Sequence, residues 1–174
     1  MKKFFLTGLV AGGMLMTGWA ATNLLANGDL LESLNPAKMA GAEEHAHVWK
    51  APLAVDASVP GFKVTRNQIF LVVAKESSKR WLALDGGGIA QTVSVTPNRA
   101  YLLKFTLEGD PQGRGEQSVA IQAPGVNTSE NVSQEGRRQI TTQFRPTSDK
   151  AAIEIYGSSG GRGPRIFGLS VEPQ

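Results

Sequence analysis

The chain has 174 residues, with 18 Lys and Arg against 15 Asp and Glu, and it contains no cysteine. This length suits one domain, and the absence of cysteine excludes disulfide bonds and thiol chemistry. Lys2 and Lys3 lie in a segment expected to be removed, which leaves 16 basic and 15 acidic residues. A charge this close to balance argues against nucleic acid as a partner.

The first 20 residues have the pattern of a secretory signal helix. Two lysines precede an uncharged, mostly apolar run over residues 4–19, and small residues at Gly18 and Ala20 fit a cleavage site after Ala20. An uncleaved membrane anchor is the alternative, because residues 4–21 almost suffice to cross a bilayer. We favour cleavage, with one mature domain over residues 21–174 and no other membrane contact. The lysine-led signal predicts an exported bacterial protein, periplasmic or extracellular.

The first part of the mature chain predicts short strands separated by irregular segments. Residues 22–32 contain Asn27-Gly28-Asp29, a turn signal that predicts an opening strand with a kink. Residues 33–47 are small and polar and predict an irregular connection. Prolines allow only short strands or loops over residues 51–63. The apolar run IFLVVA at residues 69–74 predicts a strand that is buried on both faces.

Residues 82–110 predict a hairpin of two half-buried antiparallel strands. Apolar and polar residues alternate over 89–95 and again over 101–107, as in strands with one buried face. Pro97 and Asn98 supply turn chemistry between them. The side chains expected to face the core are Ile89, Val93, Tyr101, Leu103 and Phe105.

The remaining residues continue the pattern of short strands. Strands are expected at 118–122, 138–145, 150–156 and 165–171, the last with Phe167, Leu169 and Val171 on one face. Residues 123–137 contain few apolar side chains and predict a long exposed loop. Many short strands with frequent turns predict an all-β fold, an antiparallel β-sandwich or jelly roll.

Several motifs resemble galactose-binding-like jelly-roll domains. They are the opening NLLANGDL from Asn23, Trp49, the rhythm of residues 81–105, and the closing GPRIFGLSV from Gly163. The chain is especially similar to the cell-wall family numbered 642 among domains of unknown function, and to carbohydrate-binding modules. This resemblance implies non-catalytic binding of glycans.

The same resemblance implies a structural calcium ion near the first strand, where Asn27, Asp29 and Glu32 would be its ligands. This sequence departs from the family pattern, because Phe167-Gly168 stands where the last strand usually has two aspartates. Calcium binds six to eight oxygens, and carboxylates supply much of its affinity. The loss of the acidic pair therefore argues against the site, and no other cofactor is expected.

No arrangement of residues points to catalysis. His45 and His47 beside Glu43 and Glu44 could begin a metal site, but no further His or Cys completes it, so a solvated polar linker is favoured. No Gly-x-Ser-x-Gly motif is present. The glycines after Asp85 lack the lysine and helix of a phosphate-binding loop, so a tight turn explains them better. We therefore predict that the protein is not an enzyme.

Glycan binding needs an aromatic surface and planar polar groups. Trp81 and Tyr156 are the aromatic candidates and Arg80 and Arg162 the polar ones, whereas Trp49 is expected in the core. The sequence predicts a secreted or periplasmic module that binds envelope or extracellular polysaccharide without catalysis. The alternatives are a structural or protein-interaction β-sandwich with an envelope protein partner and, third, a small hydrolase.

Overall fold

The computed structural model describes residues 23–30, 35, 38–77, 79–113, 115–158 and 162–174. The expected signal segment, residues 1–20, and the expected calcium ligand Glu32 lie outside the described residues. No α-helix occurs among the described residues, and none of them forms a helix long and apolar enough to cross a membrane.

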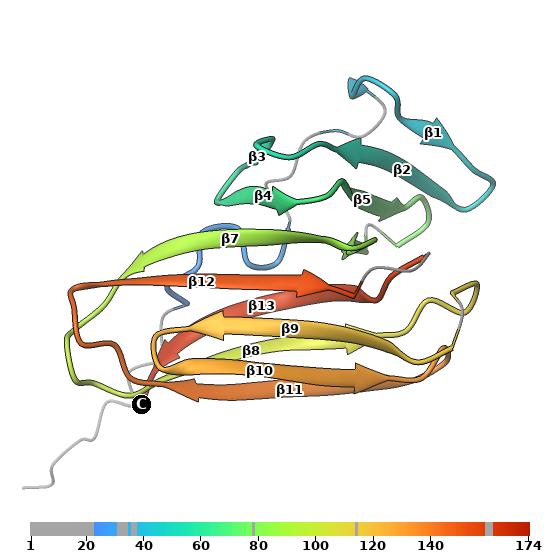
Figure 1. Ribbon diagram of the computed structural model, residues 1–174. Helices are drawn as coiled ribbons and strands as arrows, with labels where there is room; N and C mark the ends of the chain where they lie inside the picture. Colours follow the sequence, from blue (N-terminus) through green and yellow to red (C-terminus); the bar gives the residue numbers. More distant parts are fainter. Residues whose placement is uncertain (1–22, 31–34, 36–37, 78, 114, 159–161) are drawn as a thin grey trace, which may run out of the picture.

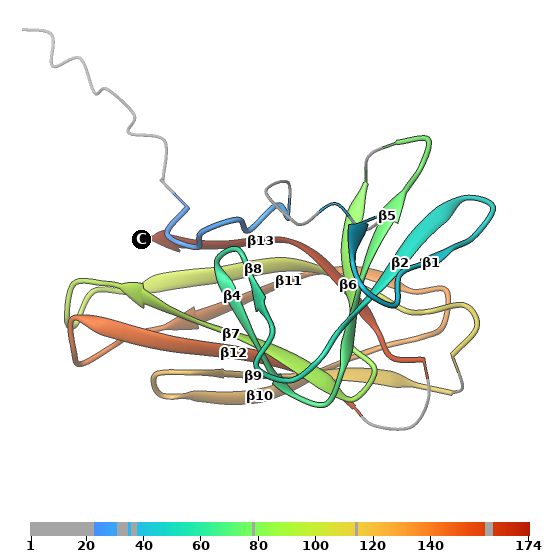
Figure 2. The same ribbon diagram turned by 90° about the horizontal axis from the view of Figure 1, so that it is seen from above.

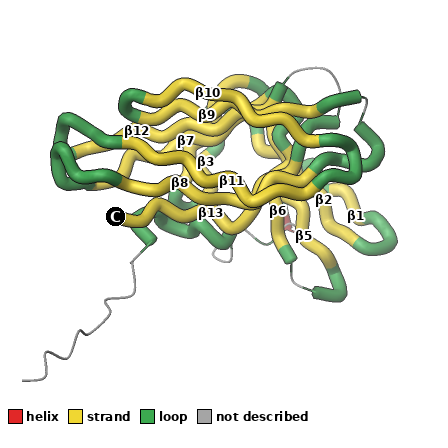
Figure 3. Tube along the Cα trace, turned by 90° about the horizontal axis from the view of Figure 1, so that it is seen from below, coloured by secondary structure: helices red, strands yellow, loops and turns green. Residues whose placement is uncertain are grey.

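Two antiparallel sheets pack face to face, as Figure 3 shows from below. The larger sheet has seven strands in the order β1-β2-β5-β6-β13-β8-β11. Their bounds are Glu43–Glu44 for β1, Val48–Leu53 for β2, Ile69–Ala74 for β5, Arg80–Ala83 for β6, Tyr101–Glu108 for β8, Arg137–Phe144 for β11 and Arg165–Pro173 for β13.

The smaller sheet has six strands in the order β10-β9-β12-β7-β4-β3. Their bounds are Ser58–Val59 for β3, Phe62–Arg66 for β4, Gly87–Ser94 for β7, Gln117–Ala123 for β9, Val126–Val132 for β10 and Lys150–Gly157 for β12. In Figure 1 the strands β1, β2 and β5 form a wing at one end, beyond β7 and β12. In Figure 2 the strands of this wing cross the direction of β8 and β12 at a steep angle. The predicted antiparallel β-sandwich is confirmed.

The core fills the space between the two sheets and follows from strict alternation along the strands. Every second residue of β8, from Tyr101 to Leu107, is buried. The buried apolar side chains of β12 are those of Ala151, Ile153 and Ile155, which face the core as one of the two predicted phases requires. The strand predicted at residues 69–74 is confirmed as β5, with Ile69, Leu71 and Val72 buried and the others partly exposed.

The predicted hairpin of residues 82–110 is wrong in its pairing. Its two strands form as β7 and β8, and Asn98 adopts the left-handed φ of 62° expected in the turn. However, β7 pairs with β12 and β4 in one sheet, whereas β8 pairs with β11 and β13 in the other. The turn therefore joins the two sheets across one end of the sandwich. Alternation fixes which face of a strand is buried, and it does not fix the neighbour of that strand.

The exposed loop predicted at residues 123–137 is also wrong, because its central part, Val126–Val132, forms β10. This edge strand pairs with β9 over seven residue pairs, after a tight turn at Pro124-Gly125, where Gly125 has a φ of 74°. Most of its side chains are exposed. Backbone hydrogen bonds hold a strand at a sheet edge without apolar side chains, so the hydrophobic pattern misses it.

The predicted face of Phe167 is wrong, because β13 contains a bulge. The register of β13 on β8 shifts between Phe167 and Ser170, and Gly168 has a φ of 62°. The extra residue reverses the alternation, so Ile166, Leu169 and Val171 are buried while Phe167 is partly exposed on the outer surface.

The opening strand predicted at residues 22–32 is instead a series of turns, over residues 23–30, that runs beside β13. Leu24 N donates to the Val171 carbonyl at 2.8 Å, and Leu169 N donates to the Gly28 carbonyl at 2.8 Å. Asn27 has a φ of 55°, which breaks the extended conformation where the sequence predicts a kink.

Candidate functional site

A groove of about 480 Å³ lies on the outer face of the seven-stranded sheet, the face that points away from the core. Cross-strand register builds its floor from four strands that are distant in sequence. One row joins Lys50, Val72 and Trp81, and a second joins Phe70, Ala83 and Arg165. These residues alternate with core residues such as Leu71 and Leu82, so the same strands supply both surfaces.

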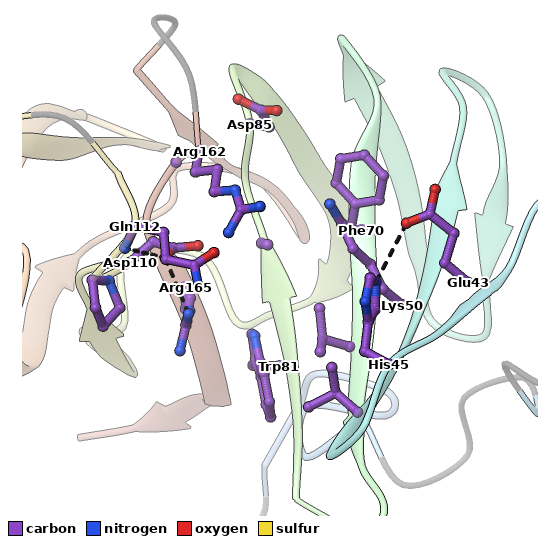
Figure 4. Close-up of a pocket in the computed structure, with 15 residues that line it drawn as sticks. Glu43, His45, Lys50, Phe70, Trp81, Asp85, Asp110, Gln112, Arg162 and Arg165 are labelled. Carbon is purple, nitrogen blue, oxygen red and sulfur yellow. Dashed lines mark hydrogen bonds and ion pairs between the residues drawn. The ribbon is translucent and has the colours of Figure 1, made fainter.

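Three loop segments form the walls of the groove (Figure 4). Asp85 follows β6, Asp110 to Gln112 follow β8, and Arg162 and Gly163 precede β13. The hairpin of β1 and β2 adds Glu43 and His45 on the opposite side, where His45 Nε2 lies 3.4 Å from Glu43 Oε2.

The wall at Asp110 is held rigidly by hydrogen bonds. The buried Gln117 side chain accepts from Asp110 N at 2.8 Å and donates to the Asp110 carbonyl at 2.8 Å. The Asp110 carboxylate accepts from Gln112 N at 2.9 Å and lies 3.2 Å from Arg165 Nη2. Fixed polar groups of this kind give a binding site a defined geometry before the ligand arrives.

The wall at Arg162 depends on a close backbone approach. A Cβ added at Gly163 would lie 1.9 Å from the Leu84 carbonyl oxygen, so a side chain has no room there. Leu84 N donates to the Pro164 carbonyl at 2.9 Å and joins this segment to the end of β6. Figure 4 shows the Arg162 side chain directed into the groove. Arg162 is exposed and makes no hydrogen bond or ion pair within the described part of the chain.

The structure brings together two of the four predicted ligand-binding residues. Trp81 and Arg162 both line the groove. Arg80 neighbours Trp81 on β6, so its side chain leaves the strand on the opposite face. Tyr156 lies in the other sheet, on the outer face of β12.

The surroundings of Tyr156 are already occupied. Arg66 Cζ lies 3.5 Å from the centre of the Tyr156 ring, and Gln122 Nε2 donates to the Tyr156 hydroxyl at 3.5 Å. Hydrogen bonds from Arg66 to the Glu154 carboxylate, at 3.0 and 3.3 Å, raise the pKa of the Arg66 guanidinium above its usual value. Trp49, expected in the core, is partly exposed on β2, with Lys75 Nζ 5.5 Å from its ring centre.

The residues proposed to bind metals do not gather around one point. His45 faces Glu43, whereas His47 Nδ1 lies 3.6 Å from Glu76 Oε1. Asn27 donates through its side-chain amide to the Pro60 carbonyl at 2.9 Å. Among the described residues, no three His, Asp or Glu side chains form a group that could hold a metal ion. The calcium site, which includes Glu32, stays a prediction.

Several residues of the groove were not predicted from the sequence, among them Lys50, Phe70, Asp110, Gln112 and Arg165. Asp110 and Gln112 belong to a segment rich in Gly and Pro, whose pattern predicts only a turn. Phe70 falls in a run that predicts burial on both faces. The missing signal was the register of β2, β5, β6 and β13, because only that register places these residues beside Trp81.

Comparison with known proteins shows the fold. No family model matches the chain, and no curated protein matches it, so the particular similarity to family 642 stays a prediction. A solved structure of a family 4 carbohydrate-binding module matches with a TM-score of 0.50 and 10% identity, over 86% of this chain and 99% of that one. At this identity the likeness shows the fold alone, and it confirms the predicted resemblance to carbohydrate-binding jelly rolls at that level.

Two further modules of the same kind are less similar. A family 35 carbohydrate-binding module from Clostridium thermocellum matches with a TM-score of 0.47 and 14% identity, over 70% of this chain and 97% of that chain. The C-terminal family 6 module of a marine laminarinase from Zobellia galactanivorans matches with a TM-score of 0.48 and 8% identity, over 71% and 98%.

Proposed function

We propose that the protein is a non-catalytic module that binds polysaccharide in the groove on the outer face of the seven-stranded sheet. The observation that carries this proposal is the combination of Trp81 at the floor with charged and amide side chains on both walls. A sugar offers C–H faces to an aromatic ring and hydroxyl groups to planar polar side chains.

The groove also has unoccupied hydrogen-bonding groups. Asp85 and Arg162 line it from different loops, and neither has a side-chain hydrogen bond or ion pair in the described part of the chain. Asp110 and Arg165 hold each other in place on the neighbouring wall. A ligand therefore meets fixed groups and free groups side by side, which favours orientation of a hydroxyl-rich chain.

We include export in the proposal, to the periplasm or the extracellular space of a bacterium. The pattern of residues 1–20 supports it. Sequencing the N-terminus of protein recovered from a bacterial envelope or culture fluid tests it, with Ala21 as the expected first residue.

Substitution of Trp81 by alanine is the direct test of the groove. We expect Trp81→Ala to weaken retention on a polysaccharide by at least about tenfold, because it removes the largest ring at the floor. Retardation in gels that contain each of a panel of neutral and acidic polysaccharides would measure it. Trp49→Ala is the matched control, since Trp49 is a partly exposed tryptophan of the same sheet outside the groove.

Three outcomes would contradict the proposal. Retention on none of the polysaccharides would leave the structural or protein-interaction β-sandwich, with an envelope protein partner, as the better explanation. Release of new reducing ends from a bound polysaccharide, abolished by Asp85→Asn, would show that the protein is a hydrolase. Retention that Tyr156→Ala weakens as much as Trp81→Ala does would contradict a site confined to the groove, because Tyr156 lies on the other sheet.

A further inference from the structure

Positively charged groups lie over the aromatic rings of the groove. Lys50 Nζ is 3.8 Å from the centre of the Phe70 ring. The ring of Trp81 has Arg165 Cζ at 5.5 Å and Lys79 Nζ at 5.9 Å. These distances are within the range of cation–π attraction.

The same arrangement continues beyond the groove to Phe167, which the bulge in β13 turns outward. Lys79 Nζ lies 4.7 Å from the centre of the Phe167 ring, and Arg137 Cζ lies 5.1 Å from it. The three rings lie on the neighbouring strands β5, β6 and β13, and Arg137 lies on β11, which β8 separates from β13. The rings and their cations thus form a strip across these five strands on the outer face. A ligand that lies along this strip meets ammonium and guanidinium groups together with the rings.

The carboxylates nearby balance only part of this charge. Asp110 and Glu108 lie 3.2 and 3.6 Å from Arg165, and Glu108 lies 3.8 Å from Lys79. Among the described residues, Lys50, Arg137 and Arg162 have no carboxylate at ion-pair distance. Two carboxylates of the groove, those of Asp85 and Glu43, have no lysine or arginine at that distance. Three cations without a carboxylate partner therefore stand against two carboxylates without a lysine or arginine partner.

We infer that the polysaccharide bound in this groove is acidic, and that its anionic groups bind Arg162, Lys50 and Arg137. This inference rests on the carbohydrate-binding function proposed above. Arg162 is the best placed of the three, because it points into the groove and is free to form charge-assisted hydrogen bonds. A carboxylate of a uronic acid and a sulfate ester share the chemistry that these side chains recognise.

Two matched pairs of polysaccharides test the inference and separate the two sources. Polygalacturonate and its fully methyl-esterified form differ in the charge of their carboxyl groups, and dextran sulfate and dextran differ in sulfate. We expect stronger retention on the charged member of at least one pair, and we expect added salt to weaken it. Arg162→Gln should weaken that retention by about tenfold. Arg145→Gln is the matched control, because Arg145 is an exposed arginine that follows the last residue of β11, whereas Arg137 is the first residue of that strand.

Each other result has a distinct meaning. Equal or stronger retention on the neutral members, or on neutral polysaccharides alone, would overturn the acidic specificity and leave the proposed function intact. Equal weakening by Arg162→Gln and Arg145→Gln would show general charge attraction and would also overturn it. Retention on no polysaccharide at all would overturn the proposed function itself. An unchanged melting temperature of Arg162→Gln, expected for a side chain without partners, excludes misfolding as the cause of any loss.

Discussion

Asn23 shows how one side chain secures an irregular part of a strand. Its Nδ2 donates to the Leu169 carbonyl at 3.0 Å, and its Oδ1 accepts from Val171 N at 2.9 Å and Leu25 N at 3.0 Å. These bonds lie beside the bulge of β13, where the regular ladder is interrupted. The amide of Asn23 thus supplies partners to backbone groups of β13 past Ile166, where the pairing with β6 ends.

We therefore predict that Asn23→Ala lowers the free energy of unfolding by about 1–3 kcal/mol, because it leaves partly buried backbone groups without partners. Urea denaturation followed by circular dichroism would measure the change. Asn131→Ala is the control, since Asn131 is exposed on the edge strand β10 and its replacement should change stability by less than about 0.5 kcal/mol. Equal effects of the two substitutions would contradict this role of Asn23.

The pair of Lys104 and Glu172 gives stability a dependence on pH. A hydrogen bond from Lys104 Nζ to Glu172 Oε2, at 2.7 Å, and a second from Ser170 lower the pKa of Glu172 below its usual value. A carboxyl with a lowered pKa in the folded state stabilises the protein above its unfolded pKa, and this contribution is lost as the pH falls through the folded pKa.

We predict that Glu172→Gln melts at a lower temperature than the unsubstituted protein at pH 7, and that the two converge well below pH 4.5, the usual value for glutamate. Thermal melts at a series of pH values would show it. A difference that stayed constant down to acidic pH would mean that the charge of Glu172 contributes nothing. Glu135→Gln, at an exposed turn, should follow the unsubstituted protein throughout.

At the scale of elements, the sequence predicts strands better than it predicts their partners. Alternation identifies β7, β8, β11 and β12 with their buried faces, because the period of two is a local property. It misses β10, whose only apolar residues are Val126 and Val132 at its two ends. It also predicts the wrong face for Phe167, because the bulge at Gly168 reverses the alternation. Pairing is not local, so the link between β7 and β8 reads as a hairpin although it joins the two sheets.

The candidate site is affected by the same limit. Trp81 and Arg162 could be named as ligand-binding residues from their chemistry alone, and both line the groove. Their neighbours Phe70 and Lys50 could not, because only the register of β2 and β5 on β6 brings them there. Tyr156 has equally suitable chemistry but lies on the other sheet. Residue type alone does not tell which of the two sheets a strand belongs to.

The connection between β6 and β13 predicts a coupled effect on stability and binding. Gly163 packs against the Leu84 carbonyl, and a Cβ at this position would have to displace the backbone. We predict that Gly163→Ala destabilises the fold by about 1–3 kcal/mol and moves Arg162 away from the groove. Ligand affinity should fall even at temperatures where the variant remains folded. Denaturation and retardation in polysaccharide gels would measure the two effects, and full affinity in a destabilised variant would contradict the coupling.

At the scale of the whole molecule, residues 23–30 close the space between the two sheets. Leu25 and Leu30 are buried in the core with 6% and 0% of their surface exposed. Backbone hydrogen bonds tie the segment to β13 on one side. On the other side, Asn27 reaches the Pro60 carbonyl, and Gly61 lies directly against Ala26, in the turn between β3 and β4 of the smaller sheet. The segment thus connects both layers, although it is not itself a strand.

This arrangement predicts two different results of shortening the chain. A protein that begins at residue 21, as expected after signal cleavage, keeps every contact of residues 23–30 and should retain full stability. A protein that begins at residue 31 loses two buried leucines and the bonds of Asn23, and each leucine alone contributes about 2 kcal/mol or more by its burial. We expect the second protein to unfold at a much lower urea concentration or to fail to fold. Equal midpoints for the two would show that the sandwich is closed without this segment.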